Sequence, residues 1–174
     1  RGVVPRELLS DQLEAVKAQA VVARTYAMAH RKGPEVPWDL RDDVGHQVYG
    51  GVQAEHPRSD AAVRATAGLV LAWQGSLASR VVYHSTCGGH TEANENVFGT
   101  PPVPYLRAVE CLDVEGRPAC AASSAATWTA EWSPEELGQE VGRSLGKPLP
   151  SIRSLEVRQA APSGRVVRLA LLGE

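Results

Sequence analysis

The 174-residue chain carries 18 Lys and Arg against 20 Asp and Glu, which gives a formal net charge of -2. This near balance, without a stripe of basic residues, argues against a nucleic-acid-binding protein. A hydrophobic fraction of 43% with 22% charged residues excludes a disordered chain, and no apolar run approaches the roughly 18 residues of a membrane-spanning helix. The composition predicts one globular domain over residues 1–174, with a core of Ala, Val and Leu because aromatic residues make up only 5%.

The first predicted element is a long helix at 11–31. Asp11 and Glu14 resemble a capping box, and Gly33 with Pro34 is a stop signal. Small apolar residues fall on one face at helical spacing: Leu13, Val16, Ala20, Ala23 and Ala27. The face is rich in Ala, so another element is expected to approach it closely.

Shorter elements follow in chain order. Residues 34–51 are a predicted loop with an extended piece at 47–49, and a second helix begins at a cap of Ser59 and Asp60 and ends near Gly68. A β-hairpin is predicted at 69–84 with its turn at 74–76, and a second hairpin at 152–160 and 165–172. A third helix is predicted at 133–142, where Ser133 is the cap and Glu136 the Glu at the third position, as in a capping box. The expected fold class is α+β, an antiparallel sheet of hairpins packed against the long N-terminal helix and shorter helices.

Both ends of the chain have the character of interior segments. Arg1-Gly2-Val3 has no initiating Met, and the last residues stop inside a predicted strand. We expect a fragment that lacks both native termini, so the missing targeting segment says nothing about compartment.

Three cysteines, Cys87, Cys111 and Cys120, are an odd number and do not form a disulfide framework. Cys111 and Cys120 flank a turn-like stretch. Two interpretations stay open for this pair, a small disulfide-closed loop in an oxidising compartment or two unpaired small apolar residues.

A second concentration of reactive groups lies at 84–92, where a predicted strand ends. Three functional interpretations compete there. His84, Cys87 and His90 can ligate zinc, Cys87 can act as a thiolate nucleophile, or the loop can bind a substrate through hydrogen bonds with Gly88 and Gly89 bringing the backbone close. The alternative is a solvent-exposed loop after the hairpin, in which the His and Cys residues have no catalytic or binding role.

Two weaker candidates for functional sites, a general acid and a metal site, lie closer to the N-terminus. Glu7 stands between apolar residues just before the long helix, and partial burial of a carboxyl favours the protonated form that a general acid needs. Asp42 and Asp43 beside His46 are candidate metal ligands, although an Asp pair in such a loop is usually turn chemistry.

Several segments, taken together, resemble the SpoIID/LytB domain family, which groups stage II sporulation protein D with amidase enhancers. The matching stretches occur in the family's order. They are Val-Val-Pro-Arg-Glu-Leu at 3–8, Lys-Ala-Gln-Ala-Val-Val-Ala-Arg-Thr-Tyr at 17–26, Gln-Val-Tyr-Gly-Gly at 47–51, Ala-Thr-Ala-Gly-Leu-Val-Leu at 65–71, Tyr-His-Ser-Thr-Cys-Gly-Gly-His-Thr-Glu at 83–92 and Pro-Tyr-Leu at 104–106.

The resemblance implies an extracytoplasmic protein of the cell envelope that acts on peptidoglycan glycan strands, with a possible membrane anchor outside this segment. Sporulation members are lytic transglycosylases, and their catalytic acid aligns with Glu7, although Leu8 and Leu9 replace the Met and Pro of the family's Glu-Met-Pro motif. The implied substrate-binding residues are Gln47, Tyr49, His84, Ser85, Thr86, Cys87, Gly88, Thr91 and Glu92. Some members carry a zinc site of Cys and His before the Gln-Val-Tyr block; this region has His46 but no Cys, so no metal or cofactor is expected.

A lytic transglycosylase is the favoured function, because one carboxyl is enough when the sugar's own hydroxyl attacks. The competing function is a glycan-binding module that stimulates a partner amidase. A zinc-dependent hydrolase built on His84, Cys87 and His90 is the second alternative.

Overall fold

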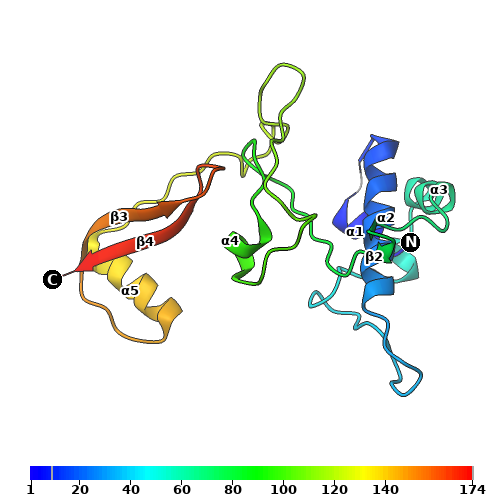
Figure 1. The fold of residues 1–174 in the computed structure, drawn as a ribbon, viewed down its shortest axis with the longest axis horizontal. Coiled ribbons are helices and arrows are strands. Elements are labelled where there is room, and N and C mark those ends of the chain that lie inside the picture. The colour runs from blue at the N-terminus through cyan, green and yellow to red at the C-terminus, as the bar shows by residue number, and fades with distance from the viewer. Residues whose placement is uncertain (9, 174) are drawn as a thin grey trace. The chain divides into compact units, whose positions relative to one another are not determined.

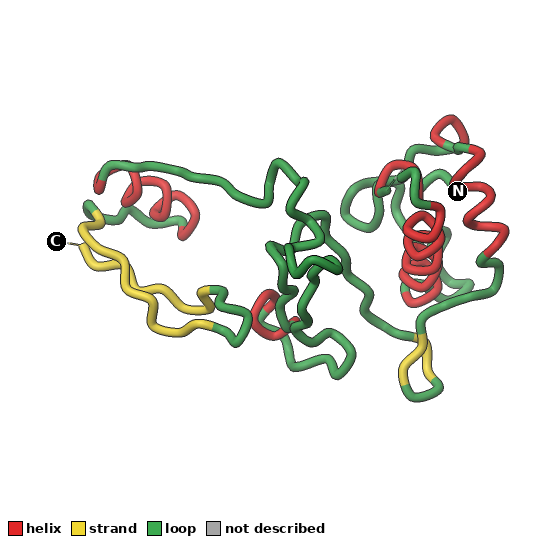
Figure 2. The backbone as a smooth tube through the Cα atoms, turned by 90° about the horizontal axis from the view of Figure 1, so that it is seen from above, coloured by secondary structure: helices red, strands yellow, loops and turns green. Residues whose placement is uncertain are grey.

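The computed structural model describes residues 1–8 and 10–173, and the chain divides into two compact units, Arg1–Tyr83 and His84–Glu174. Helices and antiparallel hairpins make up both units, which confirms the α+β class (Figures 1 and 2). None of the described helices has the length and apolar character needed to cross a bilayer. Leu9, the last residue of the altered Glu-Met-Pro motif, lies outside the described residues. A single domain over the whole chain stays a prediction.

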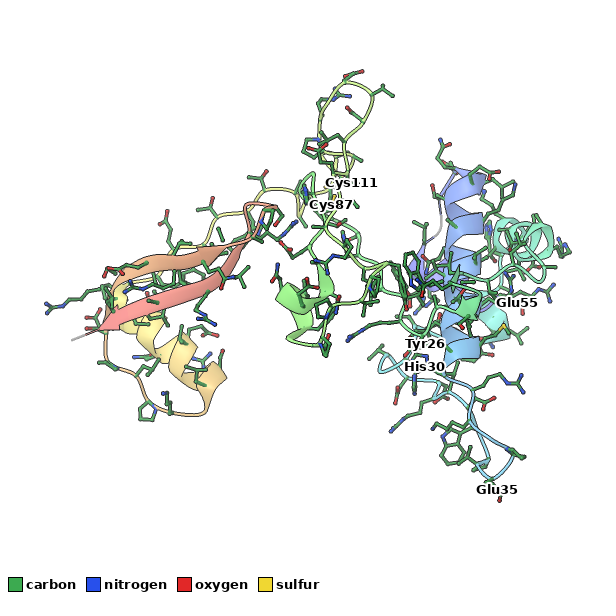
Figure 3. The ribbon with its side chains drawn as sticks, in the orientation of Figure 1. Tyr26, His30, Glu35, Glu55, Cys87 and Cys111 are labelled. Atoms are coloured by element: carbon green, nitrogen blue, oxygen red, sulfur yellow. The ribbon has the colours of Figure 1, made fainter. Side chains whose placement is uncertain are left out.

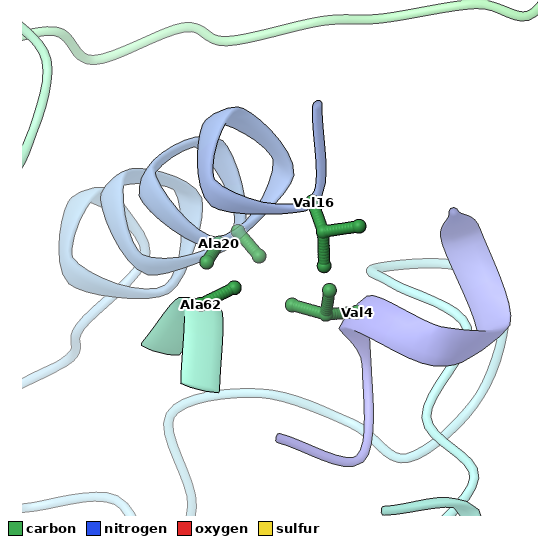
Figure 4. Packing of buried hydrophobic residues seen from close by; sticks show 5 residues of the cluster. Val4, Val16, Ala20 and Ala62 are labelled. Atoms are coloured by element: carbon green, nitrogen blue, oxygen red, sulfur yellow. The ribbon is translucent and has the colours of Figure 1, made fainter. Parts of the chain in front are cut away.

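The first unit is organised around helix α2 (Leu13–Ala29). Helices α1 (Val4–Glu7) and α3 (Pro57–Ala65) pack against α2, and a 3-10 turn, η1 (Val52–Ala54), precedes α3. The contact is made by small side chains from all three helices, namely Val4, Val16, Ala20, Ala23 and Ala62 (Figure 4). Val16 and Ala62 are fully buried, as expected where Ala lets backbones approach closely.

The helix starts differ from those predicted. Gln12 precedes α2 without a side-chain cap, while Asp11 forms an ion pair with Arg58, 2.8 Å from Oδ1 to Nη1, so the predicted capping box at Asp11 and Glu14 is wrong. Helix α3 starts at Pro57, before the predicted Ser59–Asp60 cap. His56 caps it, because its Nδ1 accepts from the Arg58 amide at 3.2 Å while Ser59 Oγ accepts from the His56 amide at 3.3 Å.

The first hairpin is shorter than predicted. Strands β1 (Ala72–Trp73) and β2 (Ser76–Leu77) pair antiparallel, and the backbone beyond β2 is irregular. Gln74 and Gly75 both adopt positive φ values, 49° and 79°, as a two-residue type I′ turn requires.

Helix α2 holds the segment that leads into this hairpin. Thr25 is fully buried, and its Oγ1 donates to the Val21 carbonyl at 2.7 Å and accepts from the Leu71 amide at 2.9 Å. Arg24 donates to the Leu69 carbonyl at 2.8 Å. The Arg-Thr pair of the 17–26 stretch therefore serves the fold, by fixing a chain segment that follows it by more than forty residues.

The second unit contains helices α4 (Asn94–Phe98) and α5 (Pro134–Leu145) and the hairpin of β3 (Ile152–Ala160) with β4 (Val166–Gly173). The sequence predicted this hairpin and the Ser133 capping box of α5, and both are confirmed. Helix α5 continues past Gly142 and lies along β3 (Figure 1). Gly138 allows this packing, because a Cβ there would lie 2.3 Å from the Pro150 carbonyl oxygen.

Candidate functional site

Glu7 is the last residue of α1, and its side chain is half-buried. Its Oε1 accepts a hydrogen bond from the Val48 amide at 2.8 Å. The Gly50 amide donates to the Gly2 carbonyl at 3.0 Å, so the N-terminal segment and the 47–51 segment are held together at two points. The structure thus brings Glu7 next to the Gln-Val-Tyr block.

Tyr83 is a further neighbour of Glu7 that sequence reasoning did not select as a site residue. Its hydroxyl donates a hydrogen bond to the Glu7 carboxylate and also contacts the Gln19 side chain. Burial of the hydroxyl, followed by the hydrogen bond and the charge of Glu7, raises the pKa of Tyr83 to about 12. Tyr83 is therefore a neutral hydrogen-bond donor at physiological pH. The only sequence signal for it was its position at the start of the 83–92 stretch.

Alkaline titration of the four tyrosines should reveal this environment. The phenolate absorbance of the wild-type chain minus that of Tyr83→Phe is expected to rise around pH 12, against an ordinary value of 10.0. Because the folded-state pKa lies above the unfolded one, the stabilisation linked to this group is complete below pH 10 and is lost as pH rises toward 12. A difference curve centred near pH 10 would contradict the assignment, and Glu7→Gln should move the midpoint downward.

Gln47 and Tyr49 line a cavity of about 420 Å³ in the first unit. Gln47 is only 7% exposed; its Nε2 donates to the Ala23 carbonyl at 3.4 Å, whereas its Oε1 has no hydrogen-bond partner among the described residues. Helices α2 and α3 and the N-terminal segment give the cavity apolar walls, made by Val3, Val4, Ala20, Ala23 and Val63. Glu7 is not part of its lining. The cavity wall is thus mainly apolar, but it also carries Gln47, Tyr49 and charged or polar side chains, namely Arg1, Arg24, Arg41, Asp42 and His46.

A cluster of aromatic side chains lies at the C-terminal end of α2. The Tyr26 hydroxyl is 3.0 Å from His46 Nδ1, and the Tyr26 ring stacks on His30 with centroids 3.9 Å apart (Figure 3). Asp43 Oδ1 accepts a hydrogen bond from the Gly45 amide at 3.0 Å, the pattern of an Asx turn. Within residues 1–8 and 10–173, no three His, Cys, Asp or Glu side chains are arranged to hold a metal ion, so the metal interpretation of Asp42, Asp43 and His46 gains no support.

The 84–92 loop belongs to the second unit, where its side chains divide into exposed and engaged groups. His84 and Ser85 are exposed. Thr86 Oγ1 lies 2.7 Å from Ser123 Oγ, and Thr91 Oγ1 accepts from the Val109 amide at 2.9 Å. Of the predicted binding side chains in this loop, those of His84 and Ser85 are the best placed to meet a ligand from solvent.

Glu92 also has internal partners. Its Oε1 accepts from the Ala93 amide at 2.8 Å and from Asn96 Nδ2 at 2.9 Å, and Ser163 Oγ donates to its Oε2. Burial acts to raise the pKa of Glu92, but the hydrogen bonds from Ser163, Asn96 and Ala93 and the charge of Arg165 outweigh burial and lower it. Glu92 is an ionised anchor that joins the loop to the turn between β3 and β4.

The zinc set of His84, Cys87 and His90 does not converge in the described structure. Cys87 is buried and faces Cys120, with 3.6 Å between the sulfur atoms, and His90 Nδ1 contacts the Thr91 carbonyl at 2.7 Å. All three cysteines, including the predicted pair Cys111 and Cys120, are free thiols.

Comparison with known proteins agrees with the resemblance found in the sequence. Residues 1–73 match the family model SpoIID, described as stage II sporulation protein. The N-terminal part of the chain is therefore similar to the SpoIID family. An amidase enhancer of Bacillus subtilis strain 168 is 43% identical over 109 residues, which cover 62% of this chain and 14% of that protein. An uncharacterized protein of Brachyspira hyodysenteriae is 39% identical over 112 residues, covering 63% of this chain and 30% of that protein.

These matches differ in how much of the site they include. The SpoIID segment 1–73 contains Glu7, Gln47 and Tyr49 but ends before Tyr83 and the 84–92 loop. A continuous match over 62% of 174 residues must include the middle of the chain, and therefore this loop. The chain nevertheless spans less than a third of the length of either relative.

Proposed function

We propose that this chain is a lytic transglycosylase of the cell envelope, which cleaves the MurNAc-GlcNAc bond of peptide-free peptidoglycan glycan and leaves 1,6-anhydro-MurNAc ends. The observation that carries the proposal is the half-buried Glu7 carboxyl, fixed by the Val48 amide and the Tyr83 hydroxyl. A carboxyl held in one orientation next to a binding segment is what proton transfer to a glycosidic oxygen requires.

One carboxyl is sufficient for this reaction. Protonated Glu7 donates its proton to the glycosidic oxygen as the bond from C1 of the muramic acid to that oxygen breaks. The resulting carboxylate then accepts the proton of the C6 hydroxyl as O6 bonds to C1, which closes the anhydro ring and restores protonated Glu7. Water does not enter, so the second carboxyl of ordinary glycosidases is not needed, and the intramolecular attack gains from proximity. No cofactor takes part.

The neighbours of Glu7 have distinct parts in this mechanism. The Val48 amide holds Oε1, and Tyr83, with its pKa raised to about 12, remains a neutral donor through the cycle. Both hydrogen bonds stabilise the carboxylate that forms after the first proton transfer. Tyr83 is thus a positioning residue rather than a second acid or base.

The chemistry of the cavity suits an amino sugar. The acetamido group of GlcNAc or MurNAc has a small apolar methyl and one N–H donor. The cavity has apolar walls, and its buried Gln47 Oε1 has no described partner. Gln47 and Tyr49 are therefore proposed to hold the sugar in the first unit. In the second unit, the exposed His84 and Ser85 and the backbone of Gly88 are proposed to contact glycan separately. Thr86, Cys87, Thr91 and Glu92 are proposed to support the loop that carries them.

A second candidate function follows from the amidase enhancer to which the chain is similar. In this case the same residues bind glycan in the cell wall, and the chain stimulates a partner amidase without cleaving the strand itself. An extracytoplasmic location is common to both proposals, and a role in sporulation is an inference from the family.

The deciding experiment compares glycan products by mass spectrometry. The chain is incubated with peptide-free glycan strands, with intact peptidoglycan, and with each plus a chelator. Release of 1,6-anhydro ends that chelator does not affect supports the transglycosylase. Glycan binding without new ends supports the enhancer, and hydrolysed, chelator-sensitive ends would establish the zinc hydrolase.

A further inference from the structure

Three cysteines that are well separated in sequence meet in the second unit. The thiol cluster consists of Cys87, Cys111 and Cys120. Cys87 is the shared member, because its sulfur lies 3.6 Å from Cys120 Sγ and its thiol is hydrogen-bonded to Cys111. Figure 3 shows Cys87 and Cys111 at neighbouring points of the loop region.

Backbone geometry brings the three thiols together. The Cys111 amide donates to the Gly89 carbonyl at 2.9 Å, and the Ala119 amide donates to the Cys111 carbonyl at 2.9 Å. Gly89 makes the first contact possible, since its φ is +96° and a Cβ there would lie 3.1 Å from Pro118. The cluster is therefore built into the local fold.

The three thiols do not have equivalent surroundings. The Gly88 amide points at Cys120 Sγ at 3.1 Å, and the amides of Cys87 and Gly89 also donate to this sulfur. Burial opposes ionisation of Cys120, but these amides outweigh it and lower the pKa of the thiol. For Cys111, the hydrogen bond with Cys87 and then burial raise the pKa. Cys120 is also partly exposed, whereas Cys87 is 4% exposed.

We propose that Cys87 and Cys120 form a disulfide when the chain meets an oxidant of the disulfide class, while Cys111 remains a thiol. The Cys120 thiolate attacks one sulfur of the external disulfide, whose S–S bond breaks and releases one thiolate. Cys87 then gives up its proton and attacks Cys120 Sγ in the mixed disulfide, releasing the second external thiolate. The external disulfide is reduced to two thiols, which take up the two protons, and the Cys pair is oxidised by two electrons.

The bond would close the chain from the 84–92 loop to the segment after Cys111. Its formation requires the two sulfur atoms to move closer from 3.6 Å to the roughly 2 Å of a disulfide. The inference rests on the geometry of the second unit alone and is independent of the proposed enzymatic function. It also differs from the pairing of Cys111 with Cys120 considered from the sequence.

The test maps disulfides in the whole chain. The reduced protein is treated with oxidised glutathione, free thiols are alkylated, and a digest made without reductant is analysed by mass spectrometry. The expected result is a linked peptide pair containing Cys87 and Cys120, with Cys111 alkylated. A dominant Cys111–Cys120 or Cys87–Cys111 link, fully alkylated cysteines, or a zinc ion retained on the reduced protein in native mass spectra would overturn the proposal.

Two controls separate native geometry from chance pairing. Cys111→Ser should form the Cys87–Cys120 bond with a yield close to that of the wild type, and a large loss of yield would count against the proposal. In urea, where the cluster is absent, the pair closest in sequence should dominate, because a shorter loop closes at a lower entropic cost. The same link pattern in urea and in buffer would contradict a geometric origin.

Discussion

Replacing Glu7 with Gln is expected to lower the release of 1,6-anhydro ends from peptide-free glycan by about 10²- to 10⁴-fold, the range that general acid–base catalysis contributes. The amide keeps the size of the side chain and an oxygen that accepts from the Val48 amide, which lies 2.8 Å from Glu7 Oε1. It cannot supply the proton that the leaving oxygen requires. The rate is measured by mass spectrometry of the anhydro products, and glycan affinity by co-sedimentation with the same strands.

Glu14→Gln is the matched control for this substitution. Glu14 lies in the first turn of α2, its side chain is 83% exposed, and its ion pair is with Lys17 on the same helix. This variant should retain the wild-type rate, since exposed pairs of this kind contribute little. An unchanged rate for Glu7→Gln would remove Glu7 from the mechanism. Loss of turnover with retained glycan affinity would separate the enzyme from a pure binding module.

Local patterns predicted much of the fold. The Ser133 capping box and the hairpin of β3 and β4 depend on residues near each other in the chain, and both are confirmed. The predicted apolar face of α2 is confirmed at Val16, Ala20 and Ala23, whereas Leu13 is exposed. The start of α3 was missed because His56, an unusual cap, replaces the expected Ser or Asp side chain. The predicted first hairpin was longer than the observed one, because the apolar residues beyond β2 continue the strand pattern but do not pair with β1.

The contacts of the candidate site could not be predicted from local sequence patterns. The resemblance selected Glu7, but its contact with the Val48 amide joins residues 41 positions apart, and its contact with Tyr83 spans a longer separation. Hydrophobic periodicity carries no information about such pairs. The same reason hid the 3.6 Å contact between the sulfur atoms of Cys87 and Cys120, 33 positions apart. From the sequence, only the neighbouring Cys111 and Cys120 were considered as a pair, with a disulfide and two unpaired residues both left open. Internal partners also made Glu92 an anchor, although its residue type suggested a ligand-binding group.

Replacing Thr25 with Val is expected to destabilise the first unit by about 1–3 kcal/mol, the cost of a buried polar group that loses its partner. Val preserves the volume of the fully buried side chain but removes the oxygen that accepts from the Leu71 amide at 2.9 Å. The Leu71 amide is then left without this acceptor at the entrance to the first hairpin. Hydrogen exchange followed by mass spectrometry should show amides of α2 exchanging roughly 5- to 150-fold faster, with α5 as an internal reference.

Thr25→Ser distinguishes the hydrogen bond from packing. Serine keeps the hydroxyl, so both the bond to the Val21 carbonyl and the bond from the Leu71 amide survive; only a buried methyl is lost, at a cost of about 1 kcal/mol. If the hydroxyl fixes the hairpin segment, the Val variant must be less stable than the Ser variant in urea unfolding. The opposite order would mean that Thr25 acts through its methyl group and that the Arg-Thr pair holds the hairpin segment through Arg24 alone. Thr129→Val, at an exposed position, should leave both exchange and unfolding unchanged.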